Sequence, residues 1–246
     1  MYRLLVFLGA LCVAASAYGQ EPPDASLTSD VVNNRMTAVE KRVRAAAVKV
    51  VDNHEGGHGS GTVVAYKDMQ LVITAQHVTP KPIGTMYEVE RGFEKHLGIV
   101  IYSNPFQDLA ILYLPKKFKS VEPMKFRPRP QLPEVGEELA YSGFPSDHQI
   151  ISVRGRVAGY ERPPLMGMQI MLHTYGWFGS SGSGVYDSKG NLVGIIWGID
   201  VERKYEATHV IEDIMWVTPI KNLNMSDAIL ALCSTVEFPS QLRVCR

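Results

Sequence analysis

Short runs of β-branched and aliphatic residues recur along this chain, and glycine, aspartate and asparagine separate them. No long amphipathic helical pattern lies between these runs, which are typical of strands in an all-β sandwich or barrel. A cluster of prolines within residues 115–133 predicts a linker between two β-units. The predicted strands lie at 46–51, 62–66, 71–75, 99–102, 109–114, 138–142, 150–157, 169–173, 192–197 and 214–217.

The first 19 residues predict a secretory signal peptide. Arg3 precedes an apolar run from Leu4 to Ala17, and small residues follow at a spacing suited to signal peptidase. Cleavage after Ala17 or Gly19 would leave a secreted or periplasmic protein with no stable membrane association. The apolar run is shorter than the roughly 18 residues expected of a membrane-spanning helix. An uncleaved segment that anchors the protein to a membrane is the alternative.

The rest of the composition is that of an ordinary globular protein. The 246 residues are 46% hydrophobic and 20% charged, with 25 Lys and Arg against 25 Asp and Glu. This balance argues against a nucleic-acid-binding protein, and the basic run at 125–129 is interpreted as a solvated linker. Polar residues 20–43 form a lead-in with a short helix over 36–44, where Thr37 and Glu40 are placed as a capping box.

The C-terminal segment, residues 223–246, predicts a short helix and a tail. Residues 224–232 have helical spacing, and Asn224 or Ser226 is placed to cap the helix.

Two cysteines remain once the signal peptide is removed, because Cys12 lies within it. In an oxidising compartment we expect Cys233 and Cys245 to form a disulfide.

One motif suggests a metal site, but its glycines argue against it. His54 and His58 fit the H-E-x-x-H zinc-protease pattern, which requires a helix that puts both histidines on one face. Gly56 and Gly57 lie between them, and each interior glycine costs a helix about 0.8–1 kcal/mol relative to alanine. We therefore expect a hairpin loop here, and no bound metal.

A cluster of serine and glycine lies between two apolar runs and has the features of a nucleophile loop. Gly179 and Gly182 flank Ser180 and Ser181. Glycines permit the tight turn that exposes a serine hydroxyl while backbone N–H groups converge to stabilise an oxyanion. The pattern makes Ser181 the candidate nucleophile, and a plain hairpin turn or flexible loop is the alternative.

Three segments in order resemble the trypsin-like (chymotrypsin-fold) serine proteases. Thr-Ala-Gln-His-Val at 74–78, after Gly-Ser-Gly at 59–61, is similar to the catalytic-histidine segment of the HtrA-type and glutamyl-endopeptidase branches. Asp-Leu-Ala-Ile-Leu at 108–112 resembles their acid segment. The chain order His, Asp, Ser is that of chymotrypsin and differs from the order in α/β-hydrolases.

The resemblance covers about residues 44–222 and implies an all-β fold of two six-stranded antiparallel β-barrels, followed by the short C-terminal helix. The first barrel would span about 44–122 and the second about 134–222. The residues after Cys233 are too few for the PDZ domain of HtrA proteins, so none is expected.

The activity implied by the resemblance is that of a secreted serine endopeptidase that cuts protein or peptide substrates through an acyl-enzyme. His77 would act as the base, Asp108 would orient it and Ser181 would attack, with oxyanion donors on Gly179 and Ser181. No cofactor is expected. An inactive trypsin-fold scaffold and an esterase-like hydrolase are the alternatives.

The resemblance also places a primary specificity pocket. Tyr175 and Gly176 would form its base, and its wall would consist of Ile195, Ile196, Trp197 and Gly198. Trypsin-like preference for Lys or Arg relies on an Asp where this chain has Tyr175, and preference for Glu relies on a His where it has Ile195. Since burying an unpaired charge costs several kcal/mol, we expect an apolar or small side chain before the scissile bond. A loop insertion that brings in Glu202, Arg203 or His209 is the alternative.

Overall fold

The computed structural model describes residues 35–53, 55–146, 148–204, 207–235 and 242–245. The predicted signal peptide and residues 20–34 of the polar lead-in lie outside these residues, as does His54. Among the described residues no helix is long and apolar enough to cross a membrane. Met36–Arg246 forms one compact unit.

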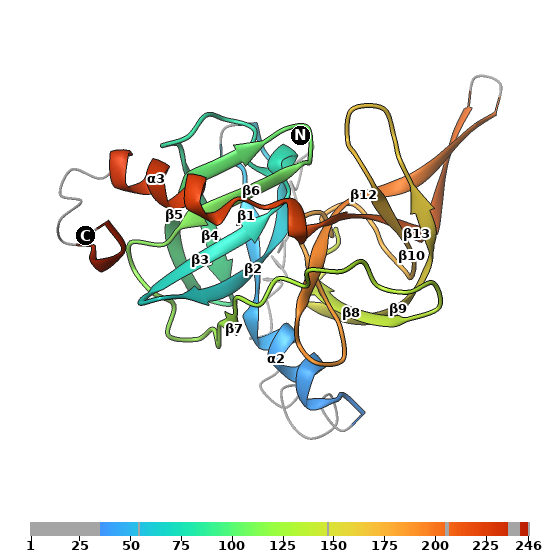
Figure 1. The fold of residues 1–246 in the computed structure, drawn as a ribbon, viewed down its shortest axis with the longest axis horizontal. Helices are drawn as coiled ribbons and strands as arrows, with labels where there is room; N and C mark the ends of the chain where they lie inside the picture. The colour runs from blue at the N-terminus through green and yellow to red at the C-terminus, as the bar shows by residue number, and fades with distance from the viewer. Residues whose placement is uncertain (1–34, 54, 147, 205–206, 236–241, 246) are drawn as a thin grey trace, which may run out of the picture. The chain divides into compact units, whose positions relative to one another are not determined.

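The first half of this unit is a closed barrel of six antiparallel strands (Figure 1). The strands pair around the barrel in the order β1, β4, β5, β6, β3 and β2, and β2 pairs back onto β1. A two-residue strand, β7 (Met124–Lys125), is added in parallel outside β2. The barrel strands are β1 (Ala47–Val51), β2 (His58–Tyr66), β3 (Met69–Thr74), β4 (Met86–Arg91), β5 (Glu94–Asn104) and β6 (Leu109–Tyr113).

A second closed barrel of six antiparallel strands lies beside the first. Its strands pair in the order β10, β13, β12, β11, β8 and β9, and β9 closes the barrel onto β10. The predicted fold of two six-stranded antiparallel barrels is therefore confirmed. The strands are β8 (Glu138–Gly143), β9 (Ile151–Glu161), β10 (Gln169–His173), β11 (Gly184–Tyr186), β12 (Leu192–Lys204) and β13 (Ala207–Pro219).

The two α-helices among the described residues carry the predicted caps. In α2 (Ala38–Ala46) the Thr37 hydroxyl accepts from the Glu40 N–H and the Glu40 carboxylate accepts from the Thr37 N–H, as the capping box requires. In α3 (Met225–Thr235) the Asn224 side chain caps the first turn and Ser226 lies inside the helix. Single 3₁₀ turns lie at η2 (Gln76–Val78), η3 (Ile220–Asn222) and η5 (Arg243–Cys245).

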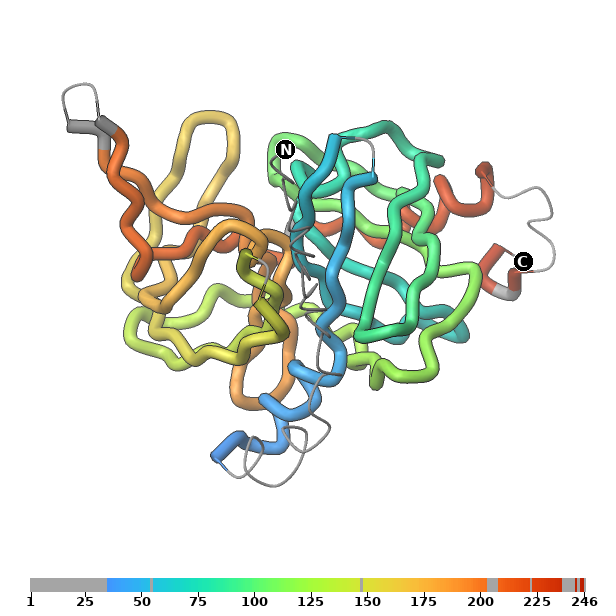
Figure 2. The backbone as a smooth tube through the Cα atoms, turned by 180° about the vertical axis from the view of Figure 1, so that it is seen from behind, coloured from blue at the N-terminus to red at the C-terminus, as the bar shows by residue number. Residues whose placement is uncertain are grey.

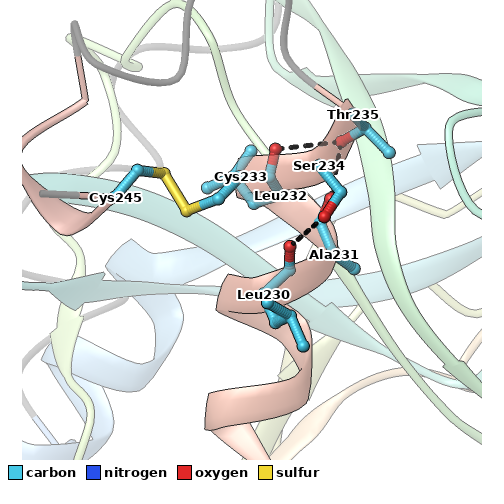
Figure 3. Close-up of a disulfide and its surroundings, with 7 residues drawn as sticks. All are labelled: Leu230, Ala231, Leu232, Cys233, Ser234, Thr235 and Cys245. Atoms are coloured by element: carbon cyan, nitrogen blue, oxygen red, sulfur yellow. Dashed lines mark hydrogen bonds between the residues drawn. A yellow bond between two sulfur atoms is a disulfide. The ribbon is translucent and has the colours of Figure 1, made fainter.

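A disulfide joins the end of α3 to the C-terminal tail (Figure 3). Cys233 and Cys245 have Cα atoms 5.5 Å apart, within the usual range for a bridge. The helix continues two residues beyond Cys233, to Thr235. In this last turn the hydroxyls of Ser234 and Thr235 donate to the carbonyls of Leu230 and Ala231. In Figure 1, α3 crosses the first barrel, and its Ala228 and Leu232 belong to that barrel's core.

Helix α2 connects the two barrels. Its Val43 and Ala46 pack into the core of the first barrel. Arg44, in its last turn, donates to the carbonyl of Ile150 and to the hydroxyl of Ser152, each at 3.0 Å. These contacts hold the edge of the second barrel against a helix anchored in the first.

The segment between the barrels is exposed at Lys125 and Arg127, as expected of a solvated linker, and backbone hydrogen bonds hold it in place. Phe126 donates its backbone N–H to Ala65 of the first barrel, while Arg127 and Arg129 exchange backbone hydrogen bonds with Leu192 of the second. The segment therefore runs along both barrels (Figure 2). These backbone hydrogen bonds to both barrels hold the segment in place although it contains several prolines.

Candidate active site

The candidate histidine lies at the end of a completely buried strand. Every residue of β3 is buried, and the chain then leaves the barrel through the single turn η2, which contains His77. Ala75 before the turn is fully buried, while the His77 side chain remains 48% exposed. A buried strand followed by one short turn therefore fixes the backbone and presents the imidazole at the surface.

The candidate acid binds this histidine through both carboxylate oxygens. The Nδ1 atom of His77 lies 2.6 Å from Oδ2 of Asp108, and the His77 backbone N–H donates to Oδ1 at 2.7 Å. The Asp108 side chain is only 10% exposed. With its Nδ1 proton directed to the carboxylate, the ring keeps Nε2 free to accept a proton, which is the tautomer that a general base requires.

The backbone at the acid is held in an unusual conformation. Asp108 has φ +49°, in the left-handed region that aspartate tolerates better than most residues. The preceding turn is tied down by the Asn104 side chain, which accepts from the N–H groups of Phe106 and Gln107. Leu109 then enters β6 with no exposed surface. The turn and the buried strand together direct the carboxylate at His77.

The candidate nucleophile lies in a loop whose conformation requires glycine at two positions. Gly179 and Gly182 have φ +94° and +93°. A Cβ on residue 182 would lie 1.9 Å from the Ser60 carbonyl oxygen, and one on residue 179 would lie 2.5 Å from that of Phe144. No other residue fits at either position without moving the backbone. The predicted nucleophile turn is therefore a specific loop and not a generic flexible one.

Ser60, on β2 of the first barrel, forms hydrogen bonds with this loop. Its N–H donates to the Ser181 carbonyl and its hydroxyl to the Gly179 carbonyl, both at 2.7 Å. The same hydroxyl accepts from the Phe144 N–H at 2.9 Å, and Thr74 donates to the Ser60 carbonyl. Ser60 has no exposed surface. One buried residue of the first barrel therefore joins the loop that carries Ser181 to the second barrel.

Two backbone N–H groups in the loop remain available to a ligand. Ser180 donates to the Trp177 carbonyl and Gly182 to the Ile196 carbonyl, whereas neither Gly179 nor Ser181 donates its N–H to any described residue. The carbonyl of Phe178 accepts from the Ser146 N–H at 2.6 Å, which fixes the peptide plane that carries the Gly179 N–H. Unpaired N–H groups on the candidate serine and on the residue two positions before it can form an oxyanion site.

Ser181 and His77 line the same cavity, of about 270 Å³. The Ser181 hydroxyl donates to the Trp197 carbonyl at a long 3.4 Å, and the hydrogen bonds of the described residues include none between this hydroxyl and the His77 ring. Catalytic hydrogen bonds are often long or unformed until substrate binds. The arrangement brings a serine, an oriented imidazole and two free N–H groups together at one cavity.

A family model described as a trypsin-like peptidase domain matches residues 59–195, which is more than half of the chain. The chain belongs to this family. It is accordingly a trypsin-like serine protease, a hydrolase. No curated protein matches the sequence significantly.

Solved structures share the fold. The Rv3671c protease from M. tuberculosis in its active form is 17% identical, with 85% of this chain and 86% of that chain covered and a TM-score of 0.59. The inactive form of Rv3671c protease is 18% identical over 85% of this chain and 95% of that one, with the same TM-score. The HtrA-type protease AlgW with a tripeptide is 20% identical over 82% and 63%, also at 0.59.

The residues expected to form the specificity pocket of this protease lie in different environments. Tyr175 is 45% exposed, and its carbonyl accepts from the Tyr141 hydroxyl. Burial raises the pKa of Tyr141, so the hydroxyl stays protonated and keeps donating. Ile195 and Ile196 have no exposed surface, and they pack into the first and second barrel cores respectively. They can offer a substrate only their backbone.

The other two wall residues retain some exposed surface. Trp197 donates its ring N–H to the Gln169 side chain at 3.0 Å and stacks on Trp216 at 6.2 Å between ring centroids. A Cβ at Gly198 would meet no atom within 4 Å. The face of β12 at Gly198 is therefore not covered by a neighbouring side chain.

The described part of the H-E-x-x-H motif, from Glu55 onward, is not helical. His58 begins β2 and pairs with Val51 of β1, so the described residues between the two strands belong to a hairpin loop, as predicted. The ring Nε2 of His58 lies 2.9 Å from the Phe144 carbonyl oxygen, beside Gly179. No group of three potential metal-binding side chains gathers anywhere in the described part of the chain. The sequence assigned no role to His58 or Ser60 individually, although Ser60 lies within the Gly-Ser-Gly segment that carries the resemblance.

Proposed function

We propose that the protein is a secreted serine endopeptidase that uses Ser181, His77 and Asp108 as its catalytic triad. The observation that supports this most strongly is the pair of hydrogen bonds from His77 to Asp108, beside a serine loop in which the N–H groups of Gly179 and Ser181 donate to no described residue. Secretion is supported by the signal-peptide pattern in residues 1–19.

The proposed reaction is acyl transfer. A peptide carbonyl binds with its oxygen toward the N–H groups of Gly179 and Ser181. His77 takes the Ser181 proton through Nε2 while the hydroxyl oxygen attacks the carbonyl carbon. Asp108 stabilises the imidazolium that forms. The ring then donates its proton to the leaving amine. In the second half of the reaction, water attacks the acyl-enzyme while His77 takes the proton of the water and returns it to the Ser181 oxygen.

The donors of the proposed oxyanion hole cost little to organise during the reaction. The Gly179 and Ser181 N–H groups share peptide planes with the carbonyls of Phe178 and Ser180. These carbonyls already accept from the N–H groups of Ser146 and Ser183, so the two donors need not reorient as charge develops. Removing one such donor in other enzymes costs roughly 10²–10³ in kcat. Serine, histidine and backbone supply every step, and the mechanism needs no cofactor.

Two alternative functions make different predictions. An inactive scaffold with this fold would not react with a fluorophosphonate, whereas an esterase-like hydrolase would react and would turn over simple esters without cutting peptides. The paired His77 and Asp108 favour an active enzyme, because a scaffold does not require a carboxylate held on an exposed imidazole.

The test compares the wild type with two variants of the mature protein on a pool of fluorogenic peptides. Ser181→Ala should fold and lose roughly three to six orders of magnitude in hydrolysis. Ser183→Ala is the matched control, because the Ser183 hydroxyl is buried without a hydrogen-bond partner, and it should lose less than about tenfold. EDTA should leave the wild-type rate unchanged. Retained activity in Ser181→Ala, or loss on adding EDTA, would contradict the proposal.

A further inference from the structure

Among the described residues, one cavity lies beside Ser181, on the side of His77. The catalytic cavity is lined by residues of the β1–β2 hairpin loop, by the histidine turn and by the start of the nucleophile loop. Among the described residues, segment 174–176 and strands β12 and β13 contribute nothing to this lining. The lining residues are Asp52, Gly56, Gly57, His58, His77, Val78, Phe178, Gly179 and Ser181.

The mechanism assigns this cavity to the part of the substrate that leaves first. His77 must hand its proton to the leaving amine, so the chain that follows the scissile bond has to pass the imidazole. His77 and Val78 belong to the cavity, which therefore fits that side. The side chain before the scissile bond must point away from His77, toward segment 174–176 and strand β12.

On that opposite side the space is already filled by Met215 of β13. A Cβ on Gly176 would lie 1.9 Å from the Met215 sulfur, 2.5 Å from its Cε and 2.6 Å from its Cγ. Met215 is only 1% exposed. The thioether thus packs directly on the Gly176 backbone, where a deep pocket would need empty volume.

The surrounding backbone holds Met215 in this position. Gly176 donates its N–H to the Glu212 carbonyl at 3.0 Å, and Thr174 donates to that of Asp213 at 2.9 Å. Met215 itself pairs with Ile199 of β12 and Leu172 of β10. Three neighbouring segments are therefore bonded to β13 around one side chain, which belongs to the core of the second barrel.

We propose that Met215 fills the floor of the pocket for the side chain before the scissile bond, and so restricts the enzyme to peptides with Gly, Ala or Ser at that position. The inference rests on the proposed function. A larger side chain would have to displace a buried core residue, and close-packed interiors resist added volume. Small residues fit above the sulfur without moving it.

The experiment uses mature protein and a matched series of fluorogenic peptides that differ only in the residue before the cut: Gly, Ala, Val, Leu and Phe. The wild type should cleave after Gly or Ala at least about tenfold faster than after Leu or Phe. In Met215→Ala the preference should shift by at least about tenfold toward Leu and Phe, since the variant vacates several methylene-sized groups. Met215→Val vacates less and should shift the preference toward Val only.

Met171→Ala is the matched control. Met171 lies on β10 of the same barrel and its Cε packs against Gly159, away from Gly176. The control loses the same atoms and should keep the wild-type preference. If Met215→Ala does not fold, the Met215→Val result decides.

Active-site titration with a fluorophosphonate separates the two levels of the argument. Labelled enzyme that cuts equally well after Leu, Phe and Ala, or whose preference is unchanged in Met215→Ala and Met215→Val, would overturn the role of Met215 and leave the proposed triad standing. Absence of both labelling and hydrolysis would overturn the proposed function, and this inference with it.

Discussion

The two barrels differ in what covers their cores and in what they contribute to the site. The core of the first barrel extends into α2, α3 and the disulfide-linked tail, and it also takes up Tyr186 and Ile195 from the second barrel's strands. The described core of the second barrel is smaller and consists of strand residues together with Leu132. The first barrel contains the complete pair of His77 and Asp108, whereas the loop with Ser181 belongs to the second.

This difference shows that the two halves of the site depend on different bonds. The histidine and its acid are joined within one well-covered barrel. The nucleophile loop relies on bonds that cross between barrels, above all those of Ser60 with Gly179 and Ser181. Substitutions in the His77–Asp108 pair should lower kcat with little effect on the free energy of unfolding. Substitutions that remove hydrogen bonds between the barrels should lower both.

The largest effect is expected inside the first barrel, at the acid. Asp108→Asn keeps the size of the side chain but favours the wrong imidazole tautomer, so kcat should fall by roughly 10³–10⁴ with little change in the melting temperature. Asp68→Asn, at an exposed position of the same barrel, should leave kcat unchanged. Steady-state kinetics and thermal melts check both variants. A fall of less than tenfold would show that Asp108 does not orient His77.

The next effect concerns the disulfide that links α3 to the C-terminal tail beside the first barrel. Opening the disulfide with Cys233→Ser and Cys245→Ser together should lower the free energy of unfolding by about 3 kcal/mol, as the chain-entropy model gives for a loop of this size. The bridge lies away from the cavity lining, so kcat/KM at 25 °C should remain within about twofold. Urea unfolding and peptide kinetics measure the two quantities. Lost activity with an unchanged free energy of unfolding would contradict the assignment of the disulfide to stability.

A smaller effect that combines both consequences is expected at the crossing bonds. Ser60→Ala leaves the Gly179 carbonyl and the Phe144 N–H without that buried partner, which should cost about 1–3 kcal/mol of stability. The displaced oxyanion donors should lower kcat roughly 10- to 100-fold.

Ser152→Ala provides the comparison for this change. The Ser152 hydroxyl also bonds between the two halves of the molecule, to Arg44 and Ser142, but away from the loop. It should lose stability with little loss of kcat. Equal losses of kcat in Ser60→Ala and Ser152→Ala would remove the distinction between bonds that hold the loop and bonds that hold the barrels together.

The smallest effect concerns the ion pair between α2 and the second barrel. A hydrogen bond from Arg154 lowers the pKa of Glu40 to about 2 from an ordinary 4.5. The pair therefore stabilises the folded state fully above about pH 4.5, and this contribution is lost as the pH falls toward 2. Because Arg154 is half-exposed, Glu40→Gln should cost only about 0.5–1 kcal/mol at pH 7.

Unfolding measured at both pH values tests this pair. The difference between wild type and Glu40→Gln should shrink from pH 7 to pH 2. A difference that grows on acidification would contradict the direction of the pKa change.

Much of the fold could be predicted because the strands alternate or run apolar between clear breaks. The strands not predicted have specific reasons. In β4 only Tyr87 and Val89 are buried, between charged neighbours, while β11 is only three residues long. The side chains of Ile195 and Ile196 were misplaced as pocket lining because β12 lies between the two barrels and buries both faces.

The site was predictable only where a local motif carries the chemistry. Segments around His77, Asp108 and Ser181 are each short and could be read directly from the sequence. The packing of Met215 on Gly176 depends on the register of β13 against a segment nearly forty positions earlier, which no local pattern reports. Ser60 was visible as part of a motif, but its hydrogen bonds with Gly179, Ser181 and Phe144 appear only once both barrels are assembled.

The most direct test of the central claim is to identify the residue that becomes covalently modified. The mature protein is treated with a fluorophosphonate, digested and analysed by peptide mass spectrometry. The account predicts a single adduct on Ser181, which disappears in Ser181→Ala and is strongly reduced in Asp108→Asn. An adduct on Ser180 or Ser183, or an unmodified protein that nevertheless cleaves peptides, would contradict it.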